Sequence, residues 1–136
     1  MLFRSRSERA LSWKPPPLPV PVKPLGTSGE ALAEDHLRGL GYEIVGRDVR
    51  TPLGQLDLVA KDGSTLVFVE VKTRAGHGFG LPQESVDARK IRKLRQLALY
   101  YLKIRPYRGP VRFDVVGLTV SDGRLVRVDH IKNAID

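Results

Sequence analysis

The sequence predicts an α/β fold in which helices flank a central mixed β-sheet, with the element order α-β-β-β-α-β-β. Two short apolar runs, Leu56–Ala60 and Leu66–Val71, are joined by turn-forming residues that include an Asp-Gly pair, which is typical of a β-hairpin. Two longer segments, about 27–40 and 86–105, repeat apolar residues at helical spacing. The second of them lies between strands, so it supplies the crossover that a parallel strand requires.

Residues 1–25 differ from the rest and predict a basic, proline-rich tail that precedes one domain at residues 26–136. Prolines at positions 15, 16, 17, 19, 21 and 24 exclude a helix or a central strand and favour extended polyproline conformation. Five Lys or Arg against one Glu give this segment a net charge of +4. We expect a semi-rigid tail; a basic arm along a nucleic-acid backbone and a P-x-x-P ligand for an SH3-type groove are the alternatives.

The first helix is expected to begin after an N-cap at Thr27 or Ser28 and to end near Leu40, with Gly41 as the residue that follows the helix. Glu30 falls in the first turn, where the helix dipole favours a carboxylate. Capping therefore explains Glu30 without any further function.

The remaining elements follow from alternation and turn signals. A first strand is expected over residues 42–50, with Gly46 as a candidate bulge. The helix at 86–105 carries one apolar stripe, which predicts core packing. Strands at about 111–120 and 125–131 surround a second Asp-Gly pair and predict another hairpin.

Ionisable side chains interrupt the most apolar part of the sequence. Side chains alternate along a strand, so Phe68, Glu70 and Lys72 share one face, and a hairpin can bring Asp57 beside Glu70. Two neighbouring carboxylates repel unless they are protonated or bridged by a cation, and Mg²⁺ often takes only one or two carboxylates. The pattern therefore predicts a Mg²⁺ or Mn²⁺ site with Lys72 facing a phosphate or a water. The alternative is a charged pair at a solvated strand end, which the apolar surroundings disfavour.

The second helix carries five cations within seven residues of its N-terminal half. These cations repel one another, and the N-terminus is the unfavourable end of the helix dipole for positive charge. We therefore expect contacts to a phosphate backbone, and the alternative is a solvated basic face. We expect Arg74 and Lys90 above all to contact nucleic acid, together with Arg89, Arg92 and Lys93.

Composition limits the classes of function. The net charge is +8 and the pI about 10.1, which favours nucleic acid over a membrane surface as the partner. There are no cysteines, and the histidines at 36, 77 and 130 show no metal-ligand spacing, so thiolate and histidine metal sites are not expected. No apolar run approaches membrane-spanning length and no signal-peptide core is seen, so a cytoplasmic location is expected. The glycine-rich residues 75–85 are either a substrate flap or a plain connector.

The pattern D-x12-E-x-K on adjacent strands resembles the signature of the restriction-endonuclease-like superfamily, written PD-(D/E)XK. From about residue 26 the chain more closely resembles the YraN-like family, which is related in fold to archaeal Holliday-junction resolvases. The matching pieces are G-E-x-x-A at Gly29–Ala33, Gly41-Tyr42, GQLDLVA at Gly54–Ala60, VFVEVKTR at Val67–Arg74, FG-x-P at Phe79–Pro82, Lys90 and A-x-x-Y-L at Ala98–Leu102.

The resemblance implies a restriction-endonuclease-like fold and a Mg²⁺-dependent endonuclease that hydrolyses DNA phosphodiester bonds, on branched or repair and recombination intermediates. Its implied metal ligands are Asp57, Glu70 and the backbone carbonyl of Val71, and Lys72 is the implied catalytic lysine. Glu30, by its place in G-E-x-x-A, is implied to complete the metal shell or to act from its second shell, with Glu34 as a substitute.

Some alternatives stay open. The family has Glu where this chain has Gln55, so a carboxylate role there is lost. A nucleic-acid-binding protein that keeps the nuclease fold without catalysis is the main alternative function. A basic scaffold whose tail recruits a protein is another. The resemblance also implies a homodimer, because a junction resolvase needs two active sites.

Overall fold

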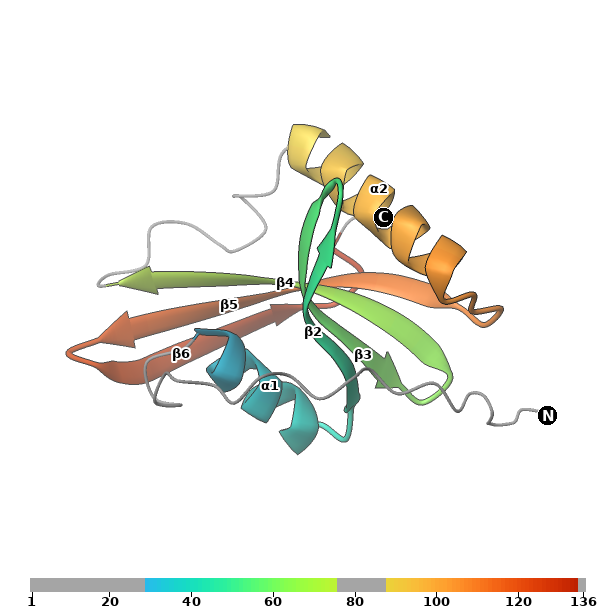
Figure 1. Ribbon diagram of the computed structural model, residues 1–136. Helices are drawn as coiled ribbons and strands as arrows, with labels where there is room; N and C mark the ends of the chain where they lie inside the picture. Colours follow the sequence, from blue (N-terminus) through green and yellow to red (C-terminus); the bar gives the residue numbers. More distant parts are fainter. Residues whose placement is uncertain (1–28, 76–87, 135–136) are drawn as a thin grey trace.

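The computed structural model describes residues 29–75 and 88–134, which form one five-stranded sheet and two helices (Figure 1). The predicted order α-β-β-β-α-β-β is confirmed. The elements are α1 (Gly29–Gly39), β2 (Glu43–Thr51), β3 (Gly54–Asp62), β4 (Thr65–Ala75), α2 (Ala88–Ile104), β5 (Val111–Ser121) and β6 (Arg124–Ile131).

The sheet is mixed, as expected, with the strand order β2-β3-β4-β5-β6. Only the β4–β5 pair is parallel, and α2 is the crossover that makes this pairing possible. β4 lies in the centre, and its residues Leu66–Glu70 are all buried. Burial on both faces therefore explains why the run from Leu66 is apolar without alternation.

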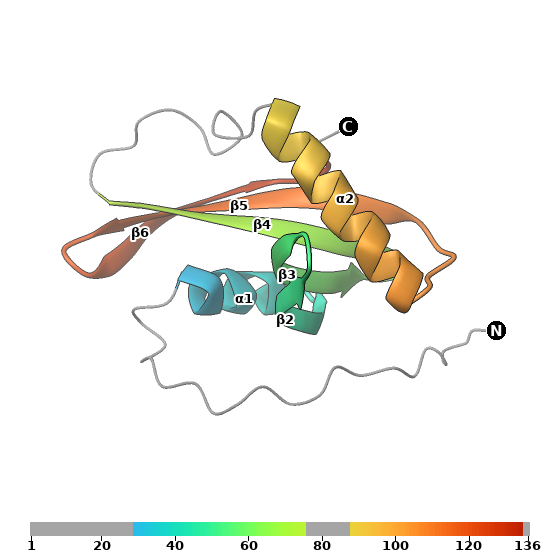
Figure 2. The same cartoon turned by 45° about the horizontal axis from the view of Figure 1, so that its top comes forward.

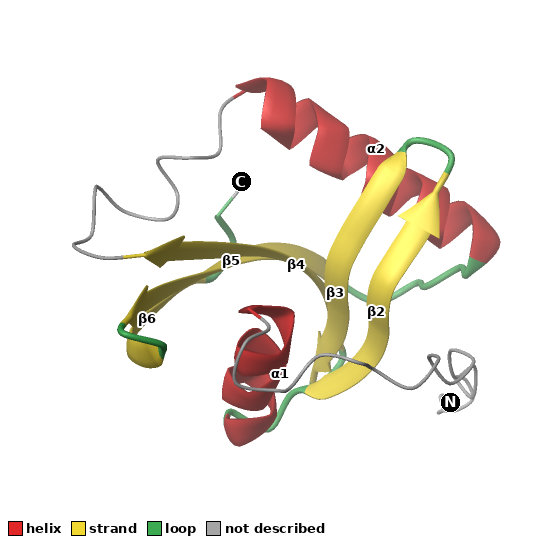
Figure 3. Ribbon diagram, turned by 60° about the vertical axis from the view of Figure 1, so that its left-hand side comes forward, coloured by secondary structure: helices red, strands yellow, loops and turns green. Residues whose placement is uncertain are grey.

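The two helices cover opposite faces of the sheet (Figure 2; Figure 3). Leu37 of α1 belongs to one cluster of buried side chains with Leu58 and Val69, whereas Leu97 of α2 belongs to the other with Phe68. Burying one such side chain stabilises the fold by about 1.5–3 kcal/mol, so both faces contribute to the core. Leu40, near the expected end of the first helix, is 52% exposed, because α1 ends at Gly39 and the chain then turns away at Gly41.

The turns and the bulge follow their residue types. Gly63 has a φ of 61° in the β3–β4 turn, and Asp122 and Gly123 have φ values of 53° and 73° between β5 and β6. In the β5–β6 turn both central residues have positive φ, which is the type I′ pattern that Asp-Gly favours in hairpins. The predicted bulge in β2 is confirmed, because the β2–β3 register shifts between Ile44 and Gly46.

One irregularity in the sheet positions the candidate site. The β3–β4 ladder ends at the pair Leu58–Val69, whereas β2 and β3 stay paired as far as Thr51–Gly54. The outer part of the β2–β3 hairpin therefore leaves the sheet and lies against α2 (Figure 3), where Leu56 joins the cluster of buried side chains under that helix. Asp57 and Glu70 flank the point where β3 and β4 part.

Several sequence predictions fall outside the described residues. These are the tail at 1–25, the N-cap at Thr27 or Ser28, the flap or connector at 75–85 beyond Ala75, and residues 86 and 87 of the second helix. In the part of the chain that is described, no helix is long and apolar enough to cross a membrane.

Candidate functional site

Asp57 and Glu70 lie side by side at the fork between β3 and β4. Glu70 is only 8% exposed, and Asp57 is partly buried. The backbone N–H of Val71 donates a hydrogen bond to Asp57 Oδ2 at 2.8 Å. The carboxylate thus takes the place of a β3 backbone partner, which Val71 lacks beyond the end of the β3–β4 ladder, and this bond fixes Asp57 next to Glu70.

The electrostatics of the fork disfavour a charged Asp57. Burial is the largest cause and, with the neighbouring charges of Glu70 and Glu30, raises the pKa of Asp57 to about 6. The hydrogen bond from Val71 and the charge of Lys90 act in the opposite direction and only partly offset this rise in pKa. An additional cation would therefore be stabilised here.

Two lysines approach the same carboxylate oxygen. Lys90 Nζ of α2 lies 2.8 Å from Glu70 Oε2, and Lys72 Nζ of β4 lies 3.5 Å from it. Hydrogen bonding to Glu70 is the main reason that the pKa of Lys90 is raised. The sequence predicted Lys72 at the site, but it did not predict that Lys90 would bind Glu70 directly.

The acidic residues of α1 have different surroundings. Glu30 is exposed, and its charge is close enough to raise the pKa of Asp57. Glu34 accepts hydrogen bonds from Arg38 at 2.7 Å and from Arg47 at 2.6 Å. Burial would raise the pKa of Glu34, but these arginine hydrogen bonds outweigh it and lower the pKa. Glu34 is therefore held by two arginines, and its role as a substitute for Glu30 stays a prediction.

Gln55, the departure from the family pattern, points to β2. Its amide Nε2 donates a hydrogen bond to Asp48 Oδ1, and Asp48 also pairs with Arg50 at 3.7 Å. Gln55 is exposed. The side chain at position 55 therefore takes part in a polar contact with β2 on the outer hairpin.

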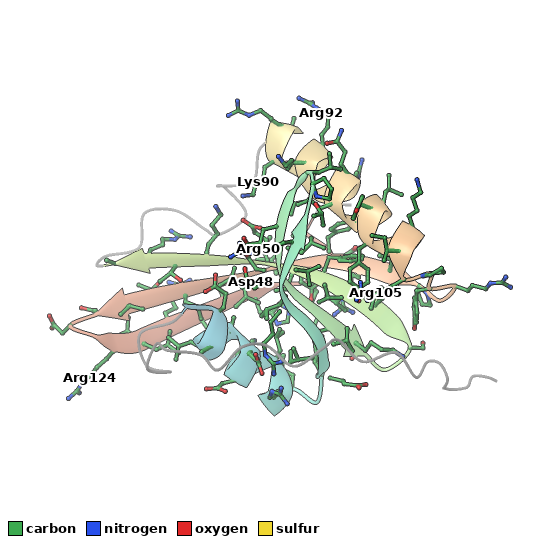
Figure 4. All side chains as sticks on the ribbon, in the orientation of Figure 1. Asp48, Arg50, Lys90, Arg92, Arg105 and Arg124 are labelled. Carbon is green, nitrogen blue, oxygen red and sulfur yellow. The ribbon has the colours of Figure 1, made fainter. Side chains whose placement is uncertain are left out.

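The predicted nucleic-acid contacts gather around the N-terminal half of α2. Arg89, Arg92 and Lys93 are exposed, and in Figure 4 Lys90 extends toward the sheet whereas Arg92 points away from it. Arg74 follows Glu70 and Lys72 on the same face of β4, by the alternation of the strand. The structure therefore places positive charge on both sides of the carboxylate pair.

The donor set at the fork fits a hydrated hard cation. Asp57 and Glu70 offer carboxylate oxygens, and Val71 offers a backbone carbonyl between them and Lys72. Among the described residues, no three His, Cys, Asp or Glu side chains are grouped closely enough to hold an ion, so Glu30 does not complete a three-carboxylate cage. Mg²⁺ keeps several waters and is often held by only one or two carboxylates, so the pair suffices for this ion. The ammonium group of Lys90 shows that Glu70 accepts a positively charged partner at this position.

A second polar cluster, on the α1 face of the sheet, was missed. Asp114 of β5 is 1% exposed and accepts hydrogen bonds from Arg112 Nε at 2.9 Å, from His130 Nε2 at 2.8 Å and from the backbone N–H of Asn133 at 3.0 Å. His36 Nε2 lies 3.1 Å from His130 Nδ1, although the two residues are 94 positions apart. The spacing of the histidines in the sequence therefore could not predict that these two side chains lie close together. The feature that could have indicated this cluster is a carboxylate, Asp114, within the apolar run VRFDVV.

The fold and the fork define an α/β domain with a carboxylate–lysine cluster at the point where two central strands part. The chain belongs to the uncharacterised protein family UPF0102, whose model matches residues 29–118. It is 44% identical over 110 residues to a UPF0102 protein of Thermodesulfovibrio yellowstonii, covering 81% of this chain and 94% of the relative. It is 48% identical over 111 residues to a UPF0102 protein of Moorella thermoacetica, covering 80% and 92%. The resemblance to the YraN-like family is thus confirmed at the level of this family.

A stability prediction follows from the raised pKa of Asp57. In buffer without divalent ions, Asp57→Asn should stabilise the protein above about pH 7 by about 1–2 kcal/mol, after discounting for the partial exposure of the side chain. The pKa is higher in the folded state than in the unfolded state, so wild-type stability falls as the pH rises from about 4 to about 6. The gain from the variant should therefore grow through that window and stay constant above it.

Thermal unfolding with a chelator, measured across this pH range, checks the prediction. Asp35→Asn on the exposed side of α1 serves as the control and should change the melting temperature little. A lower melting temperature for Asp57→Asn at neutral pH would contradict the electrostatic account of the fork.

Proposed function

We propose that this chain is a metal-dependent nuclease of the restriction-endonuclease-like type that hydrolyses DNA phosphodiester bonds. The observation that carries the proposal is the placement of Asp57 beside Glu70 with two lysines at the same carboxylate. The resemblance to a family related in fold to archaeal Holliday-junction resolvases is the reason to propose branched or repair and recombination intermediates as substrates, and a homodimer as the working form.

Each residue has a distinct role in this proposal. Asp57, Glu70 and the Val71 carbonyl hold Mg²⁺ or Mn²⁺, and Glu30 acts on this shell from a greater distance through its charge. The bound ion would lower the pKa of a water and stabilise the leaving oxygen. Lys72 orients that water or offsets the charge that builds on the phosphate. The hydrogen bond from the Val71 N–H to Asp57 keeps this carboxylate in place before substrate binds.

The test is cleavage of a DNA panel by the purified full chain. Linear duplex, single strand, nicked duplex, flap and four-way junction are incubated with Mg²⁺, with Mn²⁺ or with a chelator. The proposal expects cleavage that requires the divalent ion and that is lost in Lys72→Ala, which guards against contaminating nucleases. No Lys72-dependent cleavage of any of these DNAs would contradict it.

Removing charge from the start of α2 should weaken DNA binding. Replacing Arg89, Arg92 and Lys93 together with glutamine should lower duplex affinity about 10- to 100-fold near 0.1 M salt, because each phosphate contact releases counterions. The slope of log K against log salt should become shallower by about 0.9 for each phosphate that the variant no longer neutralises. Fluorescence anisotropy at several salt concentrations measures both quantities.

A charge-matched control separates location from net charge. Glutamine at Lys103, Arg108 and Arg124 removes the same three charges from exposed positions, of which Arg124 lies far from the start of α2 (Figure 4). These changes should leave both the affinity and the salt slope nearly unchanged. An equal loss in both triple variants would show that only the overall charge of the chain matters.

A binding protein without catalysis is the second candidate. It is favoured by the pairing of Lys90 with Glu70 and by the lack of a three-carboxylate group among residues 29–75 and 88–134. Calorimetric titration with Mn²⁺ distinguishes the candidates, because the binding protein should give no heat that depends on Asp57.

A further inference from the structure

Lys90 occupies a position that competes with a bound cation. Its Nζ lies 2.8 Å from Glu70 Oε2, closer than the 3.5 Å of Lys72. The Glu70 side chain is 9% exposed, so few waters can replace a partner that leaves it. An ammonium and a divalent ion at the same oxygen repel each other strongly.

The two lysines reach Glu70 from different elements, and both side chains are partly exposed, Lys72 by 33% and Lys90 by 35%. Lys72 is on the central strand β4, two residues from Glu70 and on the same face. Lys90 reaches the sheet from α2 through a four-carbon side chain that is 35% exposed. The backbone of α2 is held by the buried side chains of Leu94 and Leu97, so a rotation of the Lys90 side chain alone would release Glu70.

The surroundings of Lys90 favour an anion as its next partner. Arg89, Arg92 and Lys93 flank it on the same two turns of α2, and all three are exposed. When a cation replaces Lys90 at Glu70, the ammonium adds a further positive charge to this group. A phosphate that approaches the fork would then lie between the displaced lysine and the metal.

We propose that Lys90 is an internal counter-ion, which a divalent cation displaces from Glu70 and which then contacts the phosphate of the substrate. This inference rests on the proposed function and adds the regulation of the same site. It makes Lys90 a positioning residue that exchanges partners, whereas Arg89, Arg92 and Lys93 contact DNA at any metal concentration. The exchange couples metal and DNA binding, because each ligand favours the released lysine.

Removing Lys90 should strengthen metal binding, although Lys90 is proposed to contact the substrate. Lys90→Gln should bind Mn²⁺ about tenfold or more tightly than wild type, since the ion no longer competes with an ammonium. The same variant should bind duplex DNA more weakly in the presence of Ca²⁺, and addition of Ca²⁺ should enhance its DNA binding less than that of wild type. Lys93→Gln removes the same formal charge one turn further along α2, and as the matched control it should leave the Mn²⁺ affinity within about twofold.

Isothermal titration with Mn²⁺ and anisotropy with labelled duplex provide the two readouts, and neither needs catalysis. Lys90→Ala, which favours helix more strongly, repeats the test in case glutamine makes a new contact. If wild type binds Mn²⁺ but both Lys90 variants bind it equally or more weakly, the counter-ion role is wrong and the proposed function stands. If wild type itself binds no Mn²⁺, the proposed function fails and the counter-ion role fails with it.

Discussion

Replacing Glu70 with glutamine is expected to reduce Mg²⁺-dependent DNA cleavage by about a thousandfold or more, the scale of losing a principal electrostatic group in an active site. Glutamine has the same shape but lacks the charge that pairs with Lys90 and Lys72 and that would hold the metal. Single-turnover rates on the best substrate of the DNA panel measure the effect.

The control for this variant is Glu43→Gln, an exposed carboxylate on the edge strand β2, which should cleave at nearly the wild-type rate. Melting curves must accompany the rates, because a misfolded Glu70 variant would be inactive for an unrelated reason. A folded Glu70→Gln protein within tenfold of wild-type activity would exclude Glu70 from the chemistry.

The largest loss of stability is expected at Asp114, on the opposite face of the sheet. Asp114→Asn leaves Arg112 and His130 without the carboxylate that both now contact, and breaking a buried ion pair in this way costs about 3–5 kcal/mol. Such a loss is a large fraction of the stability of a domain of this size. The free energy of unfolding in urea measures it directly.

Arg112 provides its own control, since it also pairs with Asp62 at 3.1 Å, where the carboxylate side chain is 38% exposed. Asp62→Asn should cost less than about 1 kcal/mol, because exposed ion pairs contribute little. Burial would raise the pKa of Asp114, but hydrogen bonds from His130 and Arg112 outweigh it and lower the pKa. The contribution of Asp114 is therefore present at neutral pH and should disappear as the pH falls below about 4. Equal losses in both variants would contradict the role assigned to burial.

Local patterns predicted the elements of this fold well, for physical reasons that are visible in the structure. The two apolar runs predicted a hairpin, and β3 and β4 form it as an antiparallel pair with β4 buried along its run. The stripe of α2 predicted a buried helix face, which Leu94, Leu97, Ala98 and Tyr101 provide. Alternation along the strands also placed Asp57 and Glu70 on one face.

Contacts between distant segments could not be predicted in this way. The separation of β3 from β4 beyond Leu58 depends on how the outer hairpin packs under α2. The reach of Lys90 to Glu70 depends on where α2 crosses the sheet, which helical periodicity does not determine. The contact between His36 and His130 requires both α1 and β6 to be in place.

The most direct measurement is a calorimetric titration of Mn²⁺ into the wild-type chain and into Asp57→Ala at neutral pH. The wild type should give a saturable heat that disappears in the variant, while both proteins keep the same far-ultraviolet circular dichroism. A heat of the same size in both would mean that the ion binds elsewhere, and the carboxylate pair at the fork would lose its proposed role.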